Sequence, residues 1–171
     1  MVEGERRAGS LYVVSTPIGN LRDITLRAID VLRSVDLILA EDTRHSRHLL
    51  DVHGIATPML SYHEHNEARA TETAMTRLRD GRHIALISDA GTPLLSDPGA
   101  RLVAAAAEAG IPVVPVPGPS ALLAALVSSA IVGDRFTFFG FLARKGRERV
   151  EALEDLSSLR HTAVLYEAPN R

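Results

Sequence analysis

The chain has 171 residues, of which 46% are hydrophobic and 23% are charged, and its formal net charge is -2 at pH 7. This length suits one domain or one domain plus part of another. With so small a net charge, no overall field attracts nucleic acid, so RNA contacts would need a local basic patch. The absence of cysteine excludes disulfides, thiolate catalysis and cysteine-based zinc sites, and it suits a cytoplasmic protein.

Residues 1–9 combine charged and small residues and are expected to form a disordered tail without the apolar core of a signal peptide. No apolar run reaches the length of a transmembrane helix, so we expect no membrane contact. Beyond the tail, strand-like and helix-like segments alternate. The predicted strands cover 11–14, 37–40, 58–62, 83–88 and 112–114. The predicted helices cover 25–35, 43–53, 66–80 and 97–109.

Two aspartates are expected to start helices in this region: Asp23 precedes the first predicted helix, and Asp97 is followed by Pro98 at the start of the fourth. Short apolar strands that alternate with amphipathic helices are typical of a mostly parallel sheet covered on both faces. We therefore predict an α/β fold, with a five-stranded αβα sandwich over residues 10–117.

The segment 114–119 interrupts this alternation, because three prolines and one glycine make a stiff, extended crossing. It is the predicted domain boundary, with a second domain over residues 118–171. There the sequence predicts a helix at 120–131, a strand at 136–139, a basic helix at 143–156 and a strand at 162–166. These elements are few for an independent core, so we expect the second domain to be partial and the chain to be a piece of a longer protein.

Polar loops follow the predicted strands, and in a parallel sheet such loops share one edge, where ligands bind. The most informative loop reads SDAGTPLLSDPG over residues 88–99. Asp89 suits a hydrogen-bond acceptor for a ligand or a turn cap, and Gly91 suits either a close backbone approach or only a positive φ. The loop over 15–20 lacks the G-x-G-x-x-G fingerprint, and the chain has no P-loop motif, which disfavours dinucleotide binding and P-loop chemistry.

Two basic clusters offer RNA contacts despite the negative net charge. In the first, Arg44, Arg47 and His48 share a helix face by their spacing. The second consists of Arg144, Lys145, Arg147 and Arg149. A solvated surface is the alternative explanation for both clusters. The histidines at 63 and 65 lie two apart without cysteine, so we predict no structural zinc site and no metal.

Six motifs occur in order along the chain: TPIGNLRDIT, AEDTRHS, SDAGTPLLSDPG, VPGPSA, FFGFL and YEAPNR. Together they resemble the tetrapyrrole methylase superfamily over residues 11–171, and within it the bacterial branch that 2'-O-methylates 16S ribosomal RNA. The resemblance implies a five-stranded parallel αβα domain, a second mixed αβα domain, and S-adenosylmethionine (SAM) bound between them. The implied cofactor contacts are Pro17, Gly19, Asp89, Ala90, Gly91, Thr92, Ser120, Ala121, Phe141 and Leu142.

The residues agree with these implied roles, although each also has a structural explanation. Ser120 starts a predicted helix, where free N–H groups favour a carboxylate. Phe141 suits an adenine cover or a core position, and Gly19 is equally explained by a positive φ. Asp97 is interpreted as a helix cap and is not included among the site residues.

The resemblance implies transfer of a methyl group to a cytidine ribose 2'-hydroxyl, for which alignment is the main demand and a general base removes the proton. The candidates at strand ends are Glu41, Asp42 and His63, with Glu167 as a further candidate, although Glu41 and Asp42 equally suit a cap on the helix at Thr43. Implied partners are 16S rRNA or the small ribosomal subunit and a second copy of the chain. The alternatives are a methylase of corrin or porphyrin precursors, or an inactive fragment that binds RNA or self-associates.

Overall fold

The computed structural model describes residues 8–131, 133–168 and 170, and the chain divides into two compact units, Met1–Pro119 and Ser120–Arg171. The division falls two residues after the boundary predicted at 117. Most of the expected tail, residues 1–7, lies outside the described residues. Gly9 is buried, and its N–H donates to the Leu78 carbonyl oxygen at 2.8 Å. A Cβ at Gly9 would lie 1.7 Å from the Arg82 carbonyl oxygen, so this residue packs within the first unit.

Five parallel strands form the sheet of the first unit, in the order β3-β2-β4-β1-β5. This arrangement confirms the predicted five-stranded sheet. The chain moves outward from β1 to β2 and β3, then returns to β4 and crosses to β5, so the direction of winding reverses between β1 and β4. Such a switch point is where open α/β sheets bind ligands. The strands are β1 (Leu11–Val14), β2 (Leu37–Ala40), β3 (Met59–Ser61), β4 (Ile84–Ile87) and β5 (Val113–Val116).

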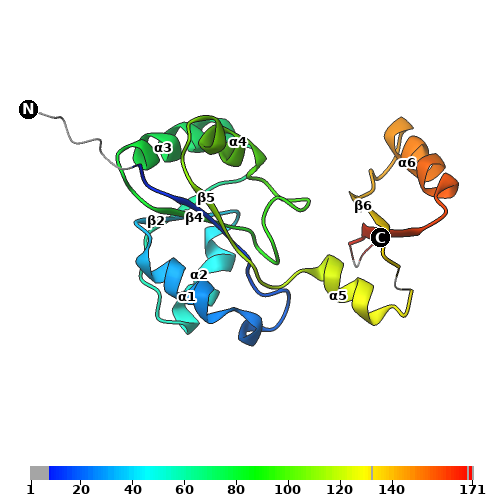
Figure 1. Ribbon diagram of the computed structural model, residues 1–171, viewed down its shortest axis with the longest axis horizontal. Helices are drawn as coiled ribbons and strands as arrows, with labels where there is room; N and C mark the ends of the chain where they lie inside the picture. Colours follow the sequence, from blue (N-terminus) through cyan, green and yellow to red (C-terminus); the bar gives the residue numbers. More distant parts are fainter. Residues whose placement is uncertain (1–7, 132, 169, 171) are drawn as a thin grey trace, which may run out of the picture. The chain divides into compact units, whose positions relative to one another are not determined.

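Helices cover both faces of this sheet, as Figure 1 shows. On one face lie α1 (Leu26–Ser34) and α2 (Thr43–Val52), and on the other lie α3 (Glu67–Arg79) and α4 (Ala100–Glu108). Side chains alternate between the two cores along β2: Ile38 and Ala40 pack toward α1 and α2, whereas Leu37 and Leu39 pack toward α3 and α4. This alternation explains why the buried strands read as continuous apolar runs.

Two predicted helix starts in the first unit are wrong, because Asp23 and Asp97, the residues expected to cap these helices, lie in the segments that precede them. Asp23 lies in a short 3-10 helix, η1 (Leu21–Asp23), and α1 is capped by Thr25, whose Oγ1 accepts the Ala28 N–H at 3.0 Å. The second case is α4, which begins after Gly99, so Asp97 and Pro98 lie in the loop. Gly99 has φ +130°, and a Cβ there would lie 2.6 Å from a methyl group of Leu86.

The second unit contains α5 (Ala121–Ser128), β6 (Phe136–Phe141), α6 (Arg147–Ser158) and β7 (Thr162–Tyr166), and β6 and β7 pair in parallel. The helix predicted from 143 starts four residues later, because Gly146 has φ +91° directly before the first turn. Few side chains of this unit are buried among the described residues. In the described part of the chain, no helix is both long and apolar enough to cross a membrane.

Candidate functional site

The loops that follow β1 and β4 are joined at the switch point. The Thr16 N–H donates to the Gly91 carbonyl oxygen at 2.8 Å, and the Gly91 N–H donates back to the Thr16 carbonyl oxygen at 3.1 Å. The hydroxyls of Ser15 and Thr92 lie 2.9 Å apart, which adds a side-chain link. Loops far apart in the sequence therefore form one backbone platform beyond the carboxyl ends of the two strands.

Glycine at position 91 meets two demands of this platform. Its φ is +84°, a backbone conformation that residues with a side chain rarely adopt, and a Cβ at this position would lie 3.3 Å from the Ile18 Cγ2. The end of the 114–119 segment packs here as well, since the Thr92 hydroxyl donates to the Pro119 carbonyl oxygen at 3.2 Å. The positive φ expected for Gly91 is thus confirmed, whereas its close approach to a ligand stays a prediction.

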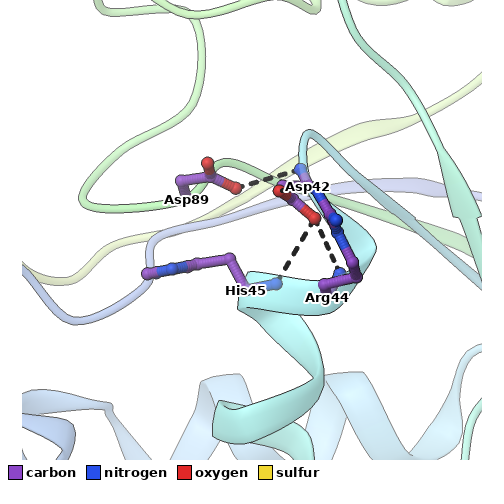
Figure 2. A network of polar contacts seen from close by, with 4 residues as sticks. All are labelled: Asp42, Arg44, His45 and Asp89. Atoms are coloured by element: carbon purple, nitrogen blue, oxygen red, sulfur yellow. Dashed lines mark hydrogen bonds and ion pairs between the residues drawn. The ribbon is translucent and has the colours of Figure 1, made fainter.

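Asp89 connects the β4 loop to the end of β2 (Figure 2). Its Oδ1 accepts the Asp42 N–H at 3.0 Å. Asp42 in turn caps α2, because its Oδ1 accepts the N–H groups of Arg44 at 2.8 Å and His45 at 3.4 Å. These backbone donors, led by the Arg44 N–H, hold the pKa of the Asp42 carboxyl below its usual value. The capping role expected for Asp42 is confirmed.

Two further carboxyl groups lie near Asp89, and both are disfavoured as anions. Burial raises the pKa of Glu41, and the nearby charges of Asp89 and Asp97 raise it further. Burial also raises the pKa of Asp97, against a hydrogen bond from the Ser88 hydroxyl that lowers it. Sequence reasoning assigned Asp97 to a helix cap and so missed it here. The signal that was available is the second Ser-Asp pair of the 88–99 loop.

These carboxyl groups belong to an acidic hollow of about 370 Å³. It is lined by Glu41, Glu64, Glu67, Ser96, Asp97 and Pro98. His63 is not among these lining residues; its Nδ1 is buried and has no hydrogen-bond partner among the described residues. Of the three general-base candidates, only Glu41 lines the acidic hollow. Asp42 caps α2, and His63 neither lines the hollow nor caps that helix.

A larger cavity of about 640 Å³ lies between the β1 loop, α2 and the β4 loop. Four predicted cofactor contacts line it: Pro17, Gly19, Asp89 and Ala90. The remaining lining residues are Thr16, Ile18, Leu21, Arg44, His45, Ser46, His48, Leu49 and Ser88. Arg44 and His48 of the first basic cluster reach the cavity, whereas Arg47 is not among the described residues that line it.

The predicted site residues of the second unit are described within that unit. Ser120 caps α5 by accepting the Leu123 N–H at 3.5 Å, and Ala121 is the first residue of α5. Phe141 is exposed, with its ring centroid 5.4 Å from that of Tyr166, whereas Leu142 is buried. Ser120 thus lies at the start of a helix, as expected for a residue that binds a carboxylate. Whether Phe141 covers an adenine or belongs to the core stays open.

The second basic cluster is partly engaged by protein groups. Arg147 pairs with Glu151 at 2.6 Å, and Arg149 donates to the Ala143 carbonyl oxygen at 3.1 Å. Arg144 and Lys145 are exposed before α6. Glu167, the further base candidate, is exposed near the end of the described chain, and its Oε1 accepts the Ala168 N–H at 2.9 Å. Within the described ranges, no group of three or more histidine, aspartate or glutamate side chains is arranged to hold a metal ion.

The parallel sheet, with its reversal of winding between β1 and β4 and the joined loops at that point, defines a doubly wound α/β protein, a class in which ligands commonly bind beyond the carboxyl ends of the strands at the switch point. The family model described as "Tetrapyrrole (Corrin/Porphyrin) Methylases" matches residues 10–171, and the chain belongs to this family.

Relatives with known names extend this assignment. The chain is 54% identical over 163 residues to "Ribosomal RNA small subunit methyltransferase I" of Synechocystis sp., covering 95% of this chain and 58% of the relative. It is 49% identical over 168 residues to the protein of the same name from Bacillus subtilis, covering 98% of this chain and 58% of the relative. The chain thus spans 58% of the length of these relatives.

Solved structures share the fold at low identity. Diphthine synthase matches with a TM-score of 0.72 at 14% identity, covering 94% of this chain and 66% of that chain. Uroporphyrin-III-C-methyltransferase from Thermus thermophilus matches with a TM-score of 0.59 at 22% identity, covering 77% of this chain and 60% of that chain. At such identities the likeness concerns the fold alone.

Proposed function

We propose that this chain forms the methyl-donor side of a SAM-dependent methyltransferase that acts on the ribose 2'-hydroxyl of a cytidine in 16S ribosomal RNA. The observation that carries the proposal is the hydrogen-bonded platform of the β1 and β4 loops, with Asp89 beside it, at the switch point of the sheet. The names of the relatives that are about 50% identical support RNA as the substrate.

The residues on the platform fit such a donor. Asp89 offers a carboxylate that accepts hydrogen bonds from a hydroxyl or an ammonium group, and Gly91, which has no side chain, lets the β4 loop lie close to the β1 loop beside it. The proposed contacts in this unit are therefore Pro17, Gly19, Asp89, Ala90, Gly91 and Thr92. Those in the second unit are Ser120, Ala121, Phe141 and Leu142.

When bound, SAM supplies a methyl group already activated by its sulfonium, so the protein mainly has to align the reacting atoms. In the proposed reaction the ribose 2'-oxygen forms a bond to the methyl carbon, the sulfur–methyl bond breaks, and sulfur takes up the bonding electrons. The hydroxyl proton passes to a base of the protein. What supports Glu41 in this role is its raised pKa beside Asp89 and Asp97, since a carboxylate poised in this way accepts a proton more readily. Asp42, His63 and Glu167 remain the other candidates.

Two basic clusters are proposed to hold RNA: Arg44 and Arg47 on α2, and Arg144, Lys145, Arg147 and Arg149 before and within α6. Assembly as a homodimer and a cytoplasmic location also stay predictions. The competing candidate is a methylase of corrin or porphyrin precursors, which the family description supports.

The test is transfer of a tritiated methyl group from SAM to isolated 16S rRNA and to small ribosomal subunits. We expect label in the RNA, released by nuclease digestion as a 2'-O-methylated nucleoside. Asp89→Ala should abolish the label, whereas Asp30→Ala, at an exposed aspartate of α1, should retain it. A folded chain that binds RNA yet transfers no methyl group would contradict the proposal and favour the non-catalytic alternative. Label found only in a porphyrin precursor would favour the competing methylase.

A further inference from the structure

The large cavity beside α2, called here the α2 cavity, combines apolar walls with a cationic rim. Ile18, Leu21 and Leu49 contribute the apolar side chains, and Arg44 and His48 are exposed cationic or ionisable groups one helical turn apart. The acidic hollow, by contrast, is lined by Glu41, Glu64, Glu67 and Asp97. The ends of the strands thus carry two hollows of opposite electrostatic character.

Arg44 is available to an anionic ligand. Its side chain is 92% exposed, and its contact with the Asp42 Oδ2 is 3.4 Å long. Exposed ion pairs of this kind contribute little to stability, because solvent screens the charges and the long arginine side chain loses conformational freedom. Asp42 makes only this one long contact with the guanidinium, whereas a phosphate can accept two parallel hydrogen bonds from it.

A second feature of the α2 cavity points independently to a ligand. Ser46 lines the cavity and is 2% exposed, and its Oγ has no hydrogen-bond partner among the described residues. A buried hydroxyl without a partner costs free energy, and such groups in native proteins usually call for an explanation. Because the Ser46 Oγ lies just behind the cavity wall, a small movement of that wall would let a polar group of a bound molecule supply the missing hydrogen bond.

We propose that the α2 cavity binds one unpaired nucleotide of an RNA strand, with its phosphate at Arg44 and His48 and its base against Ile18, Leu21 and Leu49. This inference rests on the proposed function, because it takes RNA as the substrate. The volume of about 640 Å³ lies within the range of small-molecule sites. Pockets that take up an extruded base commonly hold it against apolar side chains, and Ile18, Leu21 and Leu49 offer such a surface here.

The charges around the α2 cavity determine how the nucleotide is oriented in it. Asp89 is a carboxylate at the β4 side of the cavity, so it repels a phosphate, whereas Arg44 on α2 attracts one. The phosphate therefore lies toward the α2 rim. The ribose and base then lie toward the β1 and β4 loops, where the methyl donor is proposed to bind.

Fluorescence anisotropy with a labelled eight-nucleotide single-stranded RNA tests the rim. Arg44→Ala should bind about tenfold more weakly than the parent at low salt, the effect of one lost charge-assisted contact. The slope of log K against log salt should become shallower by about 0.7, because one phosphate contact is lost. Arg101→Ala, at an exposed arginine of α4 on the opposite face of the sheet, should bind as the parent does. Circular dichroism verifies that each variant is folded.

Amide chemical shifts test the cavity itself. Cytidine 5'-monophosphate should shift the amide signals of Ile18, Ser46 and Leu49, and cytidine alone should shift the same signals at higher concentration. If inorganic phosphate and the nucleotide shift the Arg44 region alike and leave Ile18 and Leu49 unmoved, the site is only an anion contact and the proposal is overturned.

The outcomes separate this proposal from the proposed function. RNA binding that Arg44→Ala leaves unchanged, or no RNA binding at all, overturns the α2 cavity as a nucleotide site, whatever the chain does with SAM. RNA binding lost in Arg44→Ala by a chain that does not bind SAM supports the nucleotide site and contradicts the methyl-donor proposal.

Discussion

Replacing Gly91 by alanine tests the joined β1 and β4 loops at their most constrained point. Gly91 has φ +84°, and holding alanine in the left-handed region costs about 1–2 kcal/mol. The new Cβ would also lie 3.3 Å from the Ile18 Cγ2, but Ile18 is 36% exposed and can move by a few tenths of an ångström. We therefore expect Gly91→Ala to lower the free energy of unfolding by about 1–2 kcal/mol, chiefly through backbone strain.

Gly110→Ala is the matched control. Gly110 has φ +68° and follows the end of α4, and a Cβ added there would have no neighbouring atom within 4 Å, so this position carries the same kind of backbone cost without the contact at the site. Urea unfolding followed by circular dichroism should give similar losses for both variants, and calorimetry should show weakened SAM binding only for Gly91→Ala. A Gly91→Ala chain as stable as the parent would refute the strain argument. Equal loss of SAM binding in both variants would refute the local role of Gly91.

Two further predictions concern buried polar groups. Asp97→Asn should raise the free energy of unfolding at pH 7, measured in urea. Burial raises the pKa of Asp97, so the folded state binds more protons than the unfolded state. The parent therefore loses stability as the pH rises from the usual pKa of 3.8 through the raised one. The stability gained by Asp97→Asn should vanish below pH 3.8, and a gain that persists there would contradict this cause. Tyr62→Phe should lower stability by about 1–2 kcal/mol, because the buried Tyr62 hydroxyl bonds the Thr71 hydroxyl at 2.9 Å and its removal leaves that group unpaired; unchanged stability would refute this reasoning.

The sequence predicts most of the fold because its local signals agree. The apolar runs at Leu37–Ala40 and Ile84–Ile87 are buried strands, and the glycines at 54 and 81 follow the ends of α2 and α3. The start of α4 was mispredicted because Asp97 and Pro98 form a sound capping signal by themselves. Leu86 packs so closely against Gly99 that only the three-dimensional path of the loop explains where the helix begins.

The location of the candidate site was partly predictable from the fold class. Parallel strands bring their following loops to one edge, which places the residues after β1 and β4 together. Strand order, however, depends on packing rather than on local pattern, so the alternation of elements does not show that β4 lies between β1 and β2. The burial of Ser46 and the position of Asp97 beside Asp89 follow from that order and from loop conformation.

Helical spacing alone also gave an incomplete account of α2. It correctly grouped Arg44 and His48, which both line the α2 cavity. It included Arg47 as well, which is exposed and is not among the described lining residues. A helix face is wider than the opening of the cavity, so residues on one face can differ in what they contact.

The central claim, that the β1 and β4 loops bind the methyl donor, is tested most directly by titrating SAM into the chain in a calorimeter. We predict saturable binding by the parent and by Asp30→Ala, and loss of that binding in a folded Asp89→Ala variant. Binding that Asp89→Ala leaves unchanged, or no binding by the folded parent, would contradict this claim.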